Sequence, residues 1–285
     1  MIQSMTGYGK TITQLPNKKI TVELKSLNSK NLDLNARIPS FYRAKELEMR
    51  TKVSRSLVRG KVDFSIYVEI TGEETSASVN QGVVKEYMRQ LNEISKGDAT
   101  ELLKMAVRMP DALKTEREEI DPIEFSTILE SIDTALNAIN NYRSSEGADL
   151  EVDLTKRLAL ITEHLEAVIK MDPERVAAVK ERLHKAVSDL KEQVDENRFE
   201  QELIYYLEKY DITEEIVRLK SHLAYFIETM NNSESQGKKL GFISQEMGRE
   251  INTIGSKSNY APMQQMVVMM KDELEKIKEQ SLNIL

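Results

Sequence analysis

Acidic and basic side chains gather in residues 237–258 at spacings that could form a binding site. Helical residues advance about 100° each, so Glu246, Arg249 and Glu250 fall on one side of a helix. Lys239 joins them beside an apolar stripe that would face the core, made of Leu240, Ile243, Met247, Ile251 and Ile254. A carboxylate pair can hold a metal ion, and cations can hold phosphate. The spacing fits an exposed helix with Glu–Arg ion pairs equally well.

A second segment with the same plan begins at Asp211, where Glu215 and His222 follow at helical spacing beside another apolar stripe. If the two helices pack antiparallel through these stripes, the two polar sets would face each other across a groove. Oxygen ligands with one imidazole suit Mn²⁺ or Mg²⁺. The predicted metal ligands are Asp211, Glu215, His222, Glu246 and Glu250. Structural ion pairs are the more common use of such helical carboxylates.

A divalent ion in such a site favours phosphodiester cleavage, because it can polarise the phosphate, activate a nucleophilic oxygen and stabilise the leaving group. The nucleophile could be water. In RNA it could instead be the neighbouring 2′-hydroxyl, with His222 as general acid or base. The predicted catalytic residues are His222, Glu246 and Glu250.

Residues 252–258 combine a glycine, hydroxyls and a lysine, and we consider two interpretations. The segment could form a turn whose backbone amides cradle a phosphate. It could also be an ordinary helix end and loop, which the spacing favours slightly. A P-loop is not present, because no Gly-x-x-x-x-Gly-Lys-Ser/Thr motif follows a strand here.

Basic residues are concentrated near the N-terminus of an otherwise acidic chain. Residues 1–72 carry 13 Lys and Arg against 6 Asp and Glu, whereas the chain of 285 residues has a net charge of -7. A basic module on an acidic protein indicates a local site for a polyanion. Few aromatic residues, Tyr8, Phe41 and Tyr42, could stack on bases, so we expect contacts to the phosphate backbone. The predicted RNA-binding residues are Lys25, Arg37, Arg50, Arg59, Lys61, Lys238, Lys239, Arg249 and Lys257.

The chain has no cysteine, which excludes disulfides, zinc–thiolate sites and thiol catalysis. Any metal must therefore be held by oxygen ligands and at most a histidine. We find no apolar run long enough for a membrane span and no leader segment, so we expect a cytoplasmic protein. Two further histidines, His164 and His184, lie among charged residues and are expected to be surface or packing residues.

The pattern of apolar residues predicts an α+β fold. Strands over 2–14 and from Ile20 onward, a helix over 41–58 and a strictly alternating strand over 62–70 form a small module, residues 1–72. The rest is helical, with helices expected over 81–95, 99–108, 122–170, 174 into the 190s, 200–209, 213–230, 238–253 and 262–285. A break at residues 171–173 would fold the long tract into an antiparallel arm. We expect three units: an N-terminal domain over 1–155, a connector over 156–199 and a C-terminal helical domain over 200–285.

Motifs at both ends of the chain resemble those of the YicC/YloC family. They occur in order as Ser4-Met5-Thr6-Gly7-Tyr8, Ser26-Leu27-Asn28, Arg59-Gly60-Lys61-Val62, the segment 211–222, Gly237-Lys-Lys-Leu, Gln245-Glu246, Arg249-Glu250, the segment 252–258 and 276–280. Gly241 departs from the resemblance, because similar proteins usually have Asp there. The last residues, 283–285, depart as well. The first departure leaves Glu215, His222, Glu246 and Glu250 as the favoured metal ligands.

The resemblance implies a cytoplasmic bacterial endoribonuclease that depends on Mn²⁺ or Mg²⁺ and acts on single-stranded or structured RNA in RNA turnover. It also implies a ring-like homo-oligomer, such as a hexamer, that closes around RNA. One alternative is a non-catalytic RNA clamp that delivers RNA to another ribonuclease. A further alternative, a structural oligomer without nucleic acid, requires the basic module to be coincidental.

Overall fold

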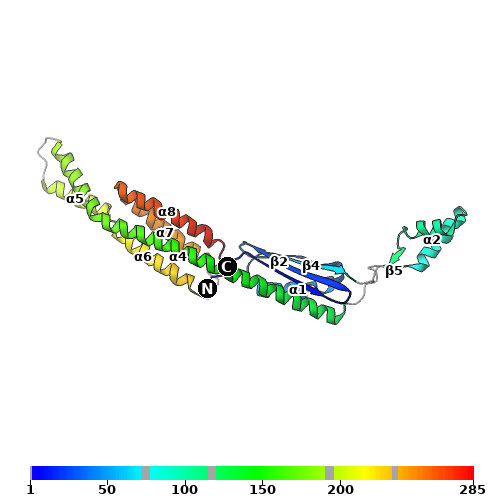
Figure 1. Ribbon diagram of the computed structural model, residues 1–285. Helices are drawn as coiled ribbons and strands as arrows, with labels where there is room; N and C mark the ends of the chain where they lie inside the picture. The colour runs from blue at the N-terminus through cyan, green and yellow to red at the C-terminus, as the bar shows by residue number, and fades with distance from the viewer. Residues whose placement is uncertain (1, 72–77, 115–119, 190–195, 233–236) are drawn as a thin grey trace.

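The chain forms an elongated molecule in which a sheet unit lies between a helical bundle and a small helical module (Figure 1). This computed structural model describes residues 2–71, 78–114, 120–189, 196–232 and 237–285. One long helix, α4 (Pro122–Asp189), runs along the sheet and continues into the bundle. The predicted α+β class is confirmed.

The sheet contains four strands in the order β1-β2-β4-β3: β1 (Gly7–Gln14), β2 (Lys18–Leu27), β4 (Gly60–Ile70) and β3 (Leu32–Arg37). The pairs β1–β2 and β2–β4 are antiparallel, and β3 joins β4 in parallel. Alternate residues of β2, Ile20, Val22 and Leu24, are fully buried, as alternation predicts. They face a core shared with α1 (Glu46–Ser56) and α4, which leaves the opposite face of the sheet uncovered by any described element.

Close contact between α4 and β1 depends on glycine. A Cβ atom on Gly9 would lie 2.2 Å from the backbone oxygen of Ala135, which no side chain tolerates. The helix expected over residues 41–58 is present as a 3₁₀ turn, η1 (Ser40–Lys45), followed by α1. These contacts place the helices on one face of the sheet and the strand charges on the other.

A small module follows the sheet, at the end of the molecule opposite the bundle (Figure 1). Strand β5 (Ser78–Val79) pairs with β6 (Leu113–Lys114), and between them lie α2 (Gln81–Ile94) and α3 (Ala99–Ala106). Asn80 and Asp98 cap the two helices, which confirms both helix predictions in this region. Its buried core is only Val84, Ala106 and Ala112, while larger apolar side chains are exposed: Val79, Ile94, Leu103, Met105 and Leu113.

The predicted break at residues 171–173 is wrong, because α4 continues as one helix through Pro173. An interior proline removes a helix hydrogen bond, but tertiary contacts hold this part of α4 in place. Arg175 is 3% exposed; its Nε donates to Asp172 Oδ1 at 2.8 Å and its Nη1 to the Lys257 carbonyl oxygen at 3.3 Å. Packing against the neighbouring helix therefore overrides the local signal.

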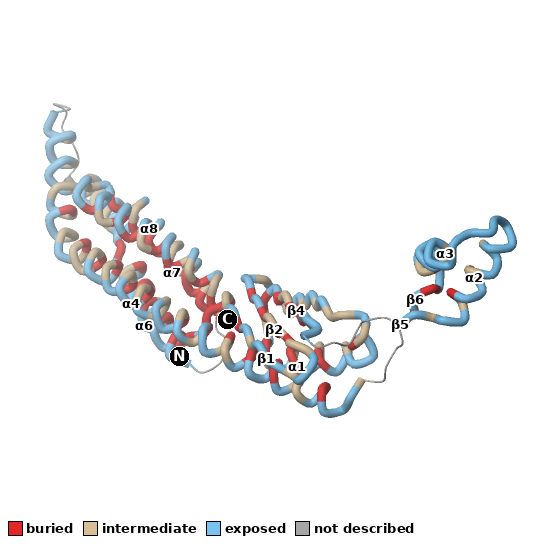
Figure 2. The backbone as a smooth tube through the Cα atoms, turned by 45° about the vertical axis from the view of Figure 1, so that its right-hand side comes forward, coloured by how far each residue is buried: buried red, intermediate tan, exposed pale blue. Residues whose placement is uncertain are grey.

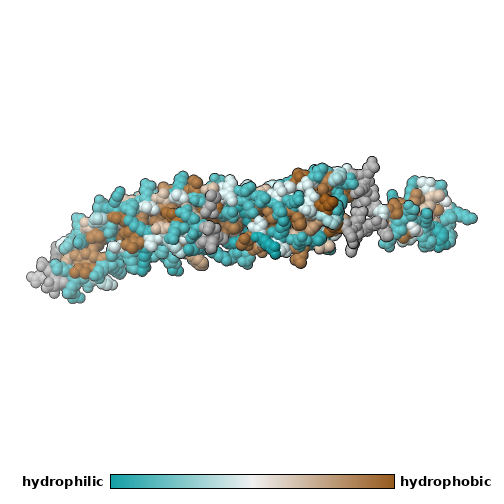
Figure 3. Space-filling model, turned by 90° about the horizontal axis from the view of Figure 1, so that it is seen from below, coloured by the Kyte–Doolittle hydropathy of each residue, from teal (hydrophilic) through white to brown (hydrophobic). Residues whose placement is uncertain are grey.

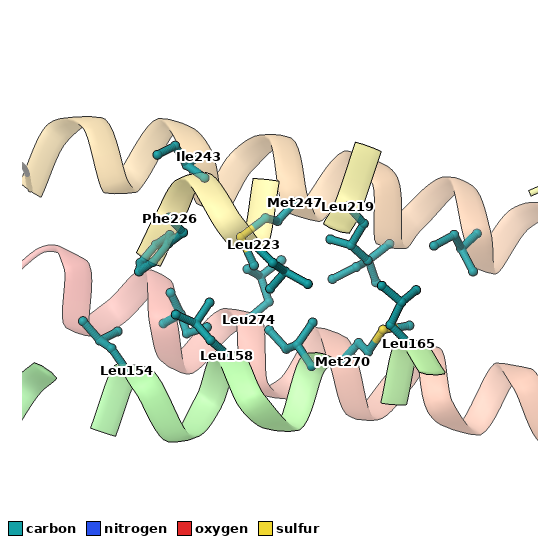
Figure 4. Packing of buried hydrophobic residues seen from close by; sticks show 14 of the residues in the cluster. Leu154, Leu158, Leu165, Leu219, Leu223, Phe226, Ile243, Met247, Met270 and Leu274 are labelled. Atoms are coloured by element: carbon teal, nitrogen blue, oxygen red, sulfur yellow. The ribbon is translucent and has the colours of Figure 1, made fainter. Parts of the chain in front are cut away.

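The second core fills a bundle of the distal half of α4 with α6 (Thr213–Met230), α7 (Gly237–Lys257) and α8 (Ala261–Ser281). Figure 4 shows Leu158, Phe226 and Met247 from three of these helices pointing toward one another. The helix α5 (Glu196–Lys209) lies at the outer end of the bundle (Figure 1). The predicted C-terminal helices are thus confirmed, although α4 crosses the expected domain boundary at residue 155.

The burial pattern along the backbone separates the bundle interior from the more exposed module over 78–114 (Figure 2). On the face seen in Figure 3, apolar residues form separate spots on a largely hydrophilic surface. Within the described ranges, no helix combines the length and apolar character that a membrane span needs.

Candidate functional site

Helices α6 and α7 pack antiparallel, as the two polar sets require. At one end, Lys239 Nζ lies 4.8 Å from the ring centroid of Tyr225 near the end of α6. At the other end, Lys257 in the last turn of α7 reaches Glu215 in the first turn of α6. The contacts fix which residues of the two helices lie at the same level.

The Lys257–Glu215 ion pair joins two residues predicted for separate tasks. Lys257 Nζ donates to Glu215 Oε1 at 2.8 Å and to the Asp211 carbonyl oxygen at 2.9 Å. Glu215 is 6% exposed, and its second oxygen, Oε2, is buried without a hydrogen-bond partner among the described residues. Lys257 is therefore occupied by a carboxylate, while Glu215 retains one free acceptor atom.

Glu250 is the most unusual carboxylate of the bundle. It is 8% exposed, yet it makes no hydrogen bond or ion pair with the part of the chain that the structure describes. Its carboxylate oxygens are not among the fully buried polar atoms of the described residues, so they reach solvent at the edge of the core. A carboxylate in this position can bind a cation without first breaking an ion pair.

Other members of the predicted site have structural partners. Glu246 pairs with Arg249 on the surface, with Nη1 and Oε1 2.9 Å apart. Asp211 Oδ1 accepts hydrogen bonds from the Thr213 side chain at 2.7 Å and from its backbone N–H at 3.2 Å. The Thr213 side chain is the main cause of a lowered Asp211 pKa. His222 is half-buried.

The structure does not gather the five predicted metal ligands. Glu246 lies 11 residues before Lys257 on α7, about 16 Å along the helix axis at 1.5 Å per residue, whereas Glu215 lies beside Lys257. In the described parts of one chain, no group of three or more His, Asp or Glu side chains could hold a metal ion. Two carboxylates keep unused acceptor capacity: Glu215 through its buried Oε2, and Glu250 through oxygens that reach solvent.

Of the two interpretations of residues 252–258, the helix end that the spacing favoured is present and the phosphate-cradling turn is not, because α7 remains helical through Lys257. Its backbone amides therefore belong to the helix ladder. Gly255 serves close packing instead: a Cβ atom there would lie 3.0 Å from Val267 Cγ1 of α8.

The N-terminal cations divide into two groups. Lys25, Arg37 and Lys61 are exposed on the open face of the sheet, where the strand register places their side chains on the same side. Arg50 and Arg59 instead donate to backbone oxygens, Arg50 Nη1 to Leu34 at 3.0 Å and Arg59 Nε to Ser29 at 2.9 Å. Lys238 of the bundle is exposed as well.

Two aromatic candidates for base stacking are engaged in packing. Tyr42 is 1% exposed, and its hydroxyl donates a hydrogen bond to Glu124. Burial first, and then this hydrogen bond, raises the pKa of the Tyr42 phenol. Phe41 packs edge-on against Tyr42 and lies under Lys18. Tyr8, in contrast, is 42% exposed.

Arg143, a central buried residue, was not among the sequence-predicted site residues. Arg143 of α4 is 1% exposed and donates through Nη2 to the Met5 carbonyl oxygen, the Ser26 hydroxyl and the Arg59 carbonyl oxygen. These acceptors come from three separate N-terminal motifs. The signal was present, because Arg143 continues the apolar stripe of Ile132, Leu136 and Ile139.

Together these features define an α+β protein with a cationic open sheet in one unit and carboxylates with unused acceptor atoms in a helical bundle. A family model described as "Endoribonuclease YicC-like, N-terminal region" matches residues 2–152, and one described as "Endoribonuclease YicC-like, C-terminal" matches residues 168–285. The chain belongs to the YicC-like endoribonuclease family, as the resemblance predicted.

Two curated relatives match over their full lengths. One from Clostridioides difficile (strain 630), named "Probable endoribonuclease YicC", is 36% identical over 292 residues, covering 100% of both chains. Another of the same name from Haemophilus influenzae is 28% identical over 288 residues, again covering 100% of both.

Proposed function

We propose that this protein is an endoribonuclease that binds RNA through its N-terminal sheet and cleaves it with carboxylates of the C-terminal bundle. The observation that carries the proposal is the match of both parts of the YicC-like family to consecutive parts of this chain. The unpaired Glu250 supports it from the physical side, because its solvent-accessible carboxylate is not committed to an ion pair in the described residues.

RNA would be held by phosphate contacts on the sheet. Arg37 and Lys61 share one exposed face with Lys25, which pairs with Glu23 at 3.1 Å and would exchange that partner for phosphate. Such contacts give affinity that depends on salt rather than on sequence. Lys238 and Lys239 would add contacts on the bundle. Raising the salt concentration should therefore weaken RNA binding, and charge reversal at Lys61 should reduce the steepness of that salt dependence.

A divalent ion, Mn²⁺ or Mg²⁺, is part of the proposal. Mg²⁺ is commonly held by one or two protein carboxylates together with substrate phosphates, so a complete cage within the protein is not required. Glu250 is the carboxylate that would hold it together with substrate phosphates, because Glu215 lies beside Lys257, seven residues or about 10 Å further along α7. The ion would supply charge stabilisation to the phosphate and a more reactive nucleophile.

The chain's own side chains would bind and move protons around the scissile phosphate. His222 is half-buried on α6 and would act as general acid or base. Glu246 is tied to Arg249, so its predicted catalytic role would require that surface ion pair to open. Glu250 is therefore the residue on which we place the greater weight.

A non-catalytic RNA clamp is the second candidate, and one observation favours it. The described part of a single chain lacks a three-ligand metal group, as a clamp would. The buried, unpaired Glu250 argues in the other direction, because a clamp for a polyanion gains nothing from it.

We also propose that the protein works in the cytoplasm as a ring-like homo-oligomer. The module over 78–114 supports self-association, because it buries only three core residues and exposes larger apolar ones. Modules of fewer than about 40 residues usually need such support. Replacing Leu103 and Met105 with Asp should lower the mass measured by light scattering. The matched change at exposed Leu47 of α1 should not.

The two functions are separated by incubating the purified protein with an end-labelled RNA in Mn²⁺, in Mg²⁺ or in EDTA. An endoribonuclease yields internal fragments with a divalent ion and intact RNA with EDTA. A clamp leaves the RNA intact in all three, while still shifting it in a native gel.

A further inference from the structure

The open face of the N-terminal sheet carries two exposed tyrosines, Tyr8 on β1 and Tyr67 on β4. Their exposed fractions are 42% and 52%. The register places Tyr8 opposite Lys25 of β2, and Tyr67 opposite Thr21 of the same strand. Their Cα positions are two strand spacings apart across the sheet and four residues apart along the strands, which gives a distance of about 16 Å. Both rings are thus available on one surface, at positions too far apart to stack on each other.

Tyr8 is held in place by a charged pair. Its hydroxyl donates to Glu23 Oε1 at 2.9 Å, and Lys25 Nζ lies 3.1 Å from the same oxygen and 5.7 Å from the ring centroid of Tyr8. Glu23 raises the pKa of Lys25, with smaller contributions from Tyr8 and then from Tyr67. A ring fixed in this way loses little conformational freedom when a ligand stacks on it.

The charges of this face favour an anionic ligand. Three of its four carboxylates are engaged: Glu23 with Lys25, Asp63 with the Asn35 side chain, and Glu69 with Lys19. The fourth, Asp33, is exposed. Two cations of the same face, Arg37 and Lys61, have no ion-pair partner in the described ranges. Lys10 lies opposite Glu23 and contributes to the lowered pKa of that carboxyl, but makes no close ion pair with it. The surface therefore combines available positive charges with aromatic rings.

We propose that single-stranded RNA lies across this open face, with one base stacked on Tyr8, another on Tyr67 and phosphates on Lys10, Arg37 and Lys61. The inference rests on the proposed ribonuclease function and names the form of RNA that it takes. Exposed aromatic rings on a sheet can stack only on unpaired bases, because the bases of a duplex already stack on one another. Duplex RNA could contact the cations but could not stack its bases on the tyrosine rings.

The test measures the binding of a fluorescent, unstructured RNA and of its duplex to the full-length protein. Tyr8→Ala and Tyr67→Ala should each weaken binding of the single strand about 5-fold to 150-fold and leave duplex binding nearly unchanged. Tyr67→Phe keeps the ring and should bind within about twofold of wild type. Tyr8→Phe keeps the ring but loses its hydrogen bond to Glu23, so it should lose less affinity than Tyr8→Ala. The matched control is Tyr142→Ala, since Tyr142 of α4 is also 52% exposed but lies on a helix.

The possible results distinguish the stacking surface from the proposed ribonuclease function. If wild type cleaves RNA while both alanine variants bind the single strand like wild type, the stacking surface is refuted and the function stands. Equal losses for single strand and duplex would also refute it. If wild type leaves RNA intact but both alanine variants lose single-strand binding, the stacking surface is supported and the function is refuted. Thermal unfolding of each variant confirms that the sheet is folded.

Discussion

Lys257 and Glu215 form an ion pair, 2.8 Å from Nζ to Oε1, that joins the last turn of α7 to the first turn of α6. The Glu215 side chain is 7% exposed, whereas that of Lys257 is 29% exposed. The cation therefore compensates a carboxylate that water barely reaches. This pair sets the level at which the two carboxylate-bearing helices meet.

Lys257→Met should destabilise the protein by about 2–3 kcal/mol, because it leaves the Glu215 charge buried without its partner. The double variant Lys257→Met, Glu215→Met should recover part of this loss, since both charges are then absent. Urea unfolding measures both effects. Lys271→Met, at an exposed lysine of α8 with no ion pair among the described residues, is the control. Equal stability of Lys257→Met and wild type would contradict the assigned role.

Glu273 should make stability depend on pH in the acid range. Hydrogen bonds from Lys276 first, and then from Arg157, hold its pKa below the usual 4.5. Because the folded pKa is the lower one, its contribution to stability is present above about pH 4.5 and is lost as the pH falls through the folded pKa. The difference in unfolding free energy between wild type and Glu273→Gln should therefore shrink from pH 6 to pH 3. A constant difference over that range would refute this linkage.

Gly9→Ala and Gly241→Ala should change stability in opposite directions. A Cβ atom on Gly9 meets the backbone of α4, so alanine should cost about 2–4 kcal/mol or prevent folding. Nothing lies within 4 Å of a Cβ atom on Gly241, which is inside α7, so alanine should add about 0.5–1 kcal/mol. Melting temperatures report both, and destabilisation by Gly241→Ala would show that the helix needs glycine there.

Glu250→Gln should change stability by less than about 1 kcal/mol, because the carboxylate oxygens reach solvent and have no partner to lose among the described residues. Glu246→Gln is the matched control on the same helix. Its carboxylate lies in a surface pair with Arg249, and loss of such a pair should change stability by less than about 1 kcal/mol. Denaturant unfolding at neutral pH measures both variants. A destabilised Glu250→Gln would mean that the carboxylate has a structural partner after all.

Periodicity predicted much of the fold because most elements carry their own local signals. The alternation of β4, the caps of α2 and α3 and the apolar stripes of α6 and α7 lie within single segments. The continuity of α4 could not be predicted in this way. It depends on Arg175 contacting the end of α7, far along the chain.

The sequence predicted which helices carry the candidate site residues, but not how these helices are placed against each other. Helical spacing correctly placed carboxylates beside the apolar stripes of α6 and α7, yet spacing within each helix says nothing about their relative level. The Lys257–Glu215 contact decides that level and separates Glu215 from Glu246. Tyr67 was missed as a candidate because an alternating strand does not reveal which of its faces remains uncovered.

The role of Glu250 in the reaction is tested by comparing RNA cleavage by wild type, Glu250→Gln and Glu246→Gln at saturating Mn²⁺. We expect Glu250→Gln to lower the cleavage rate by about 100-fold or more while the folded protein still binds RNA. Glu246→Gln should lose less than Glu250→Gln, because its carboxylate is already held by Arg249. Cleavage by Glu250→Gln at the wild-type rate would contradict the assignment of the bundle carboxylate to the reaction.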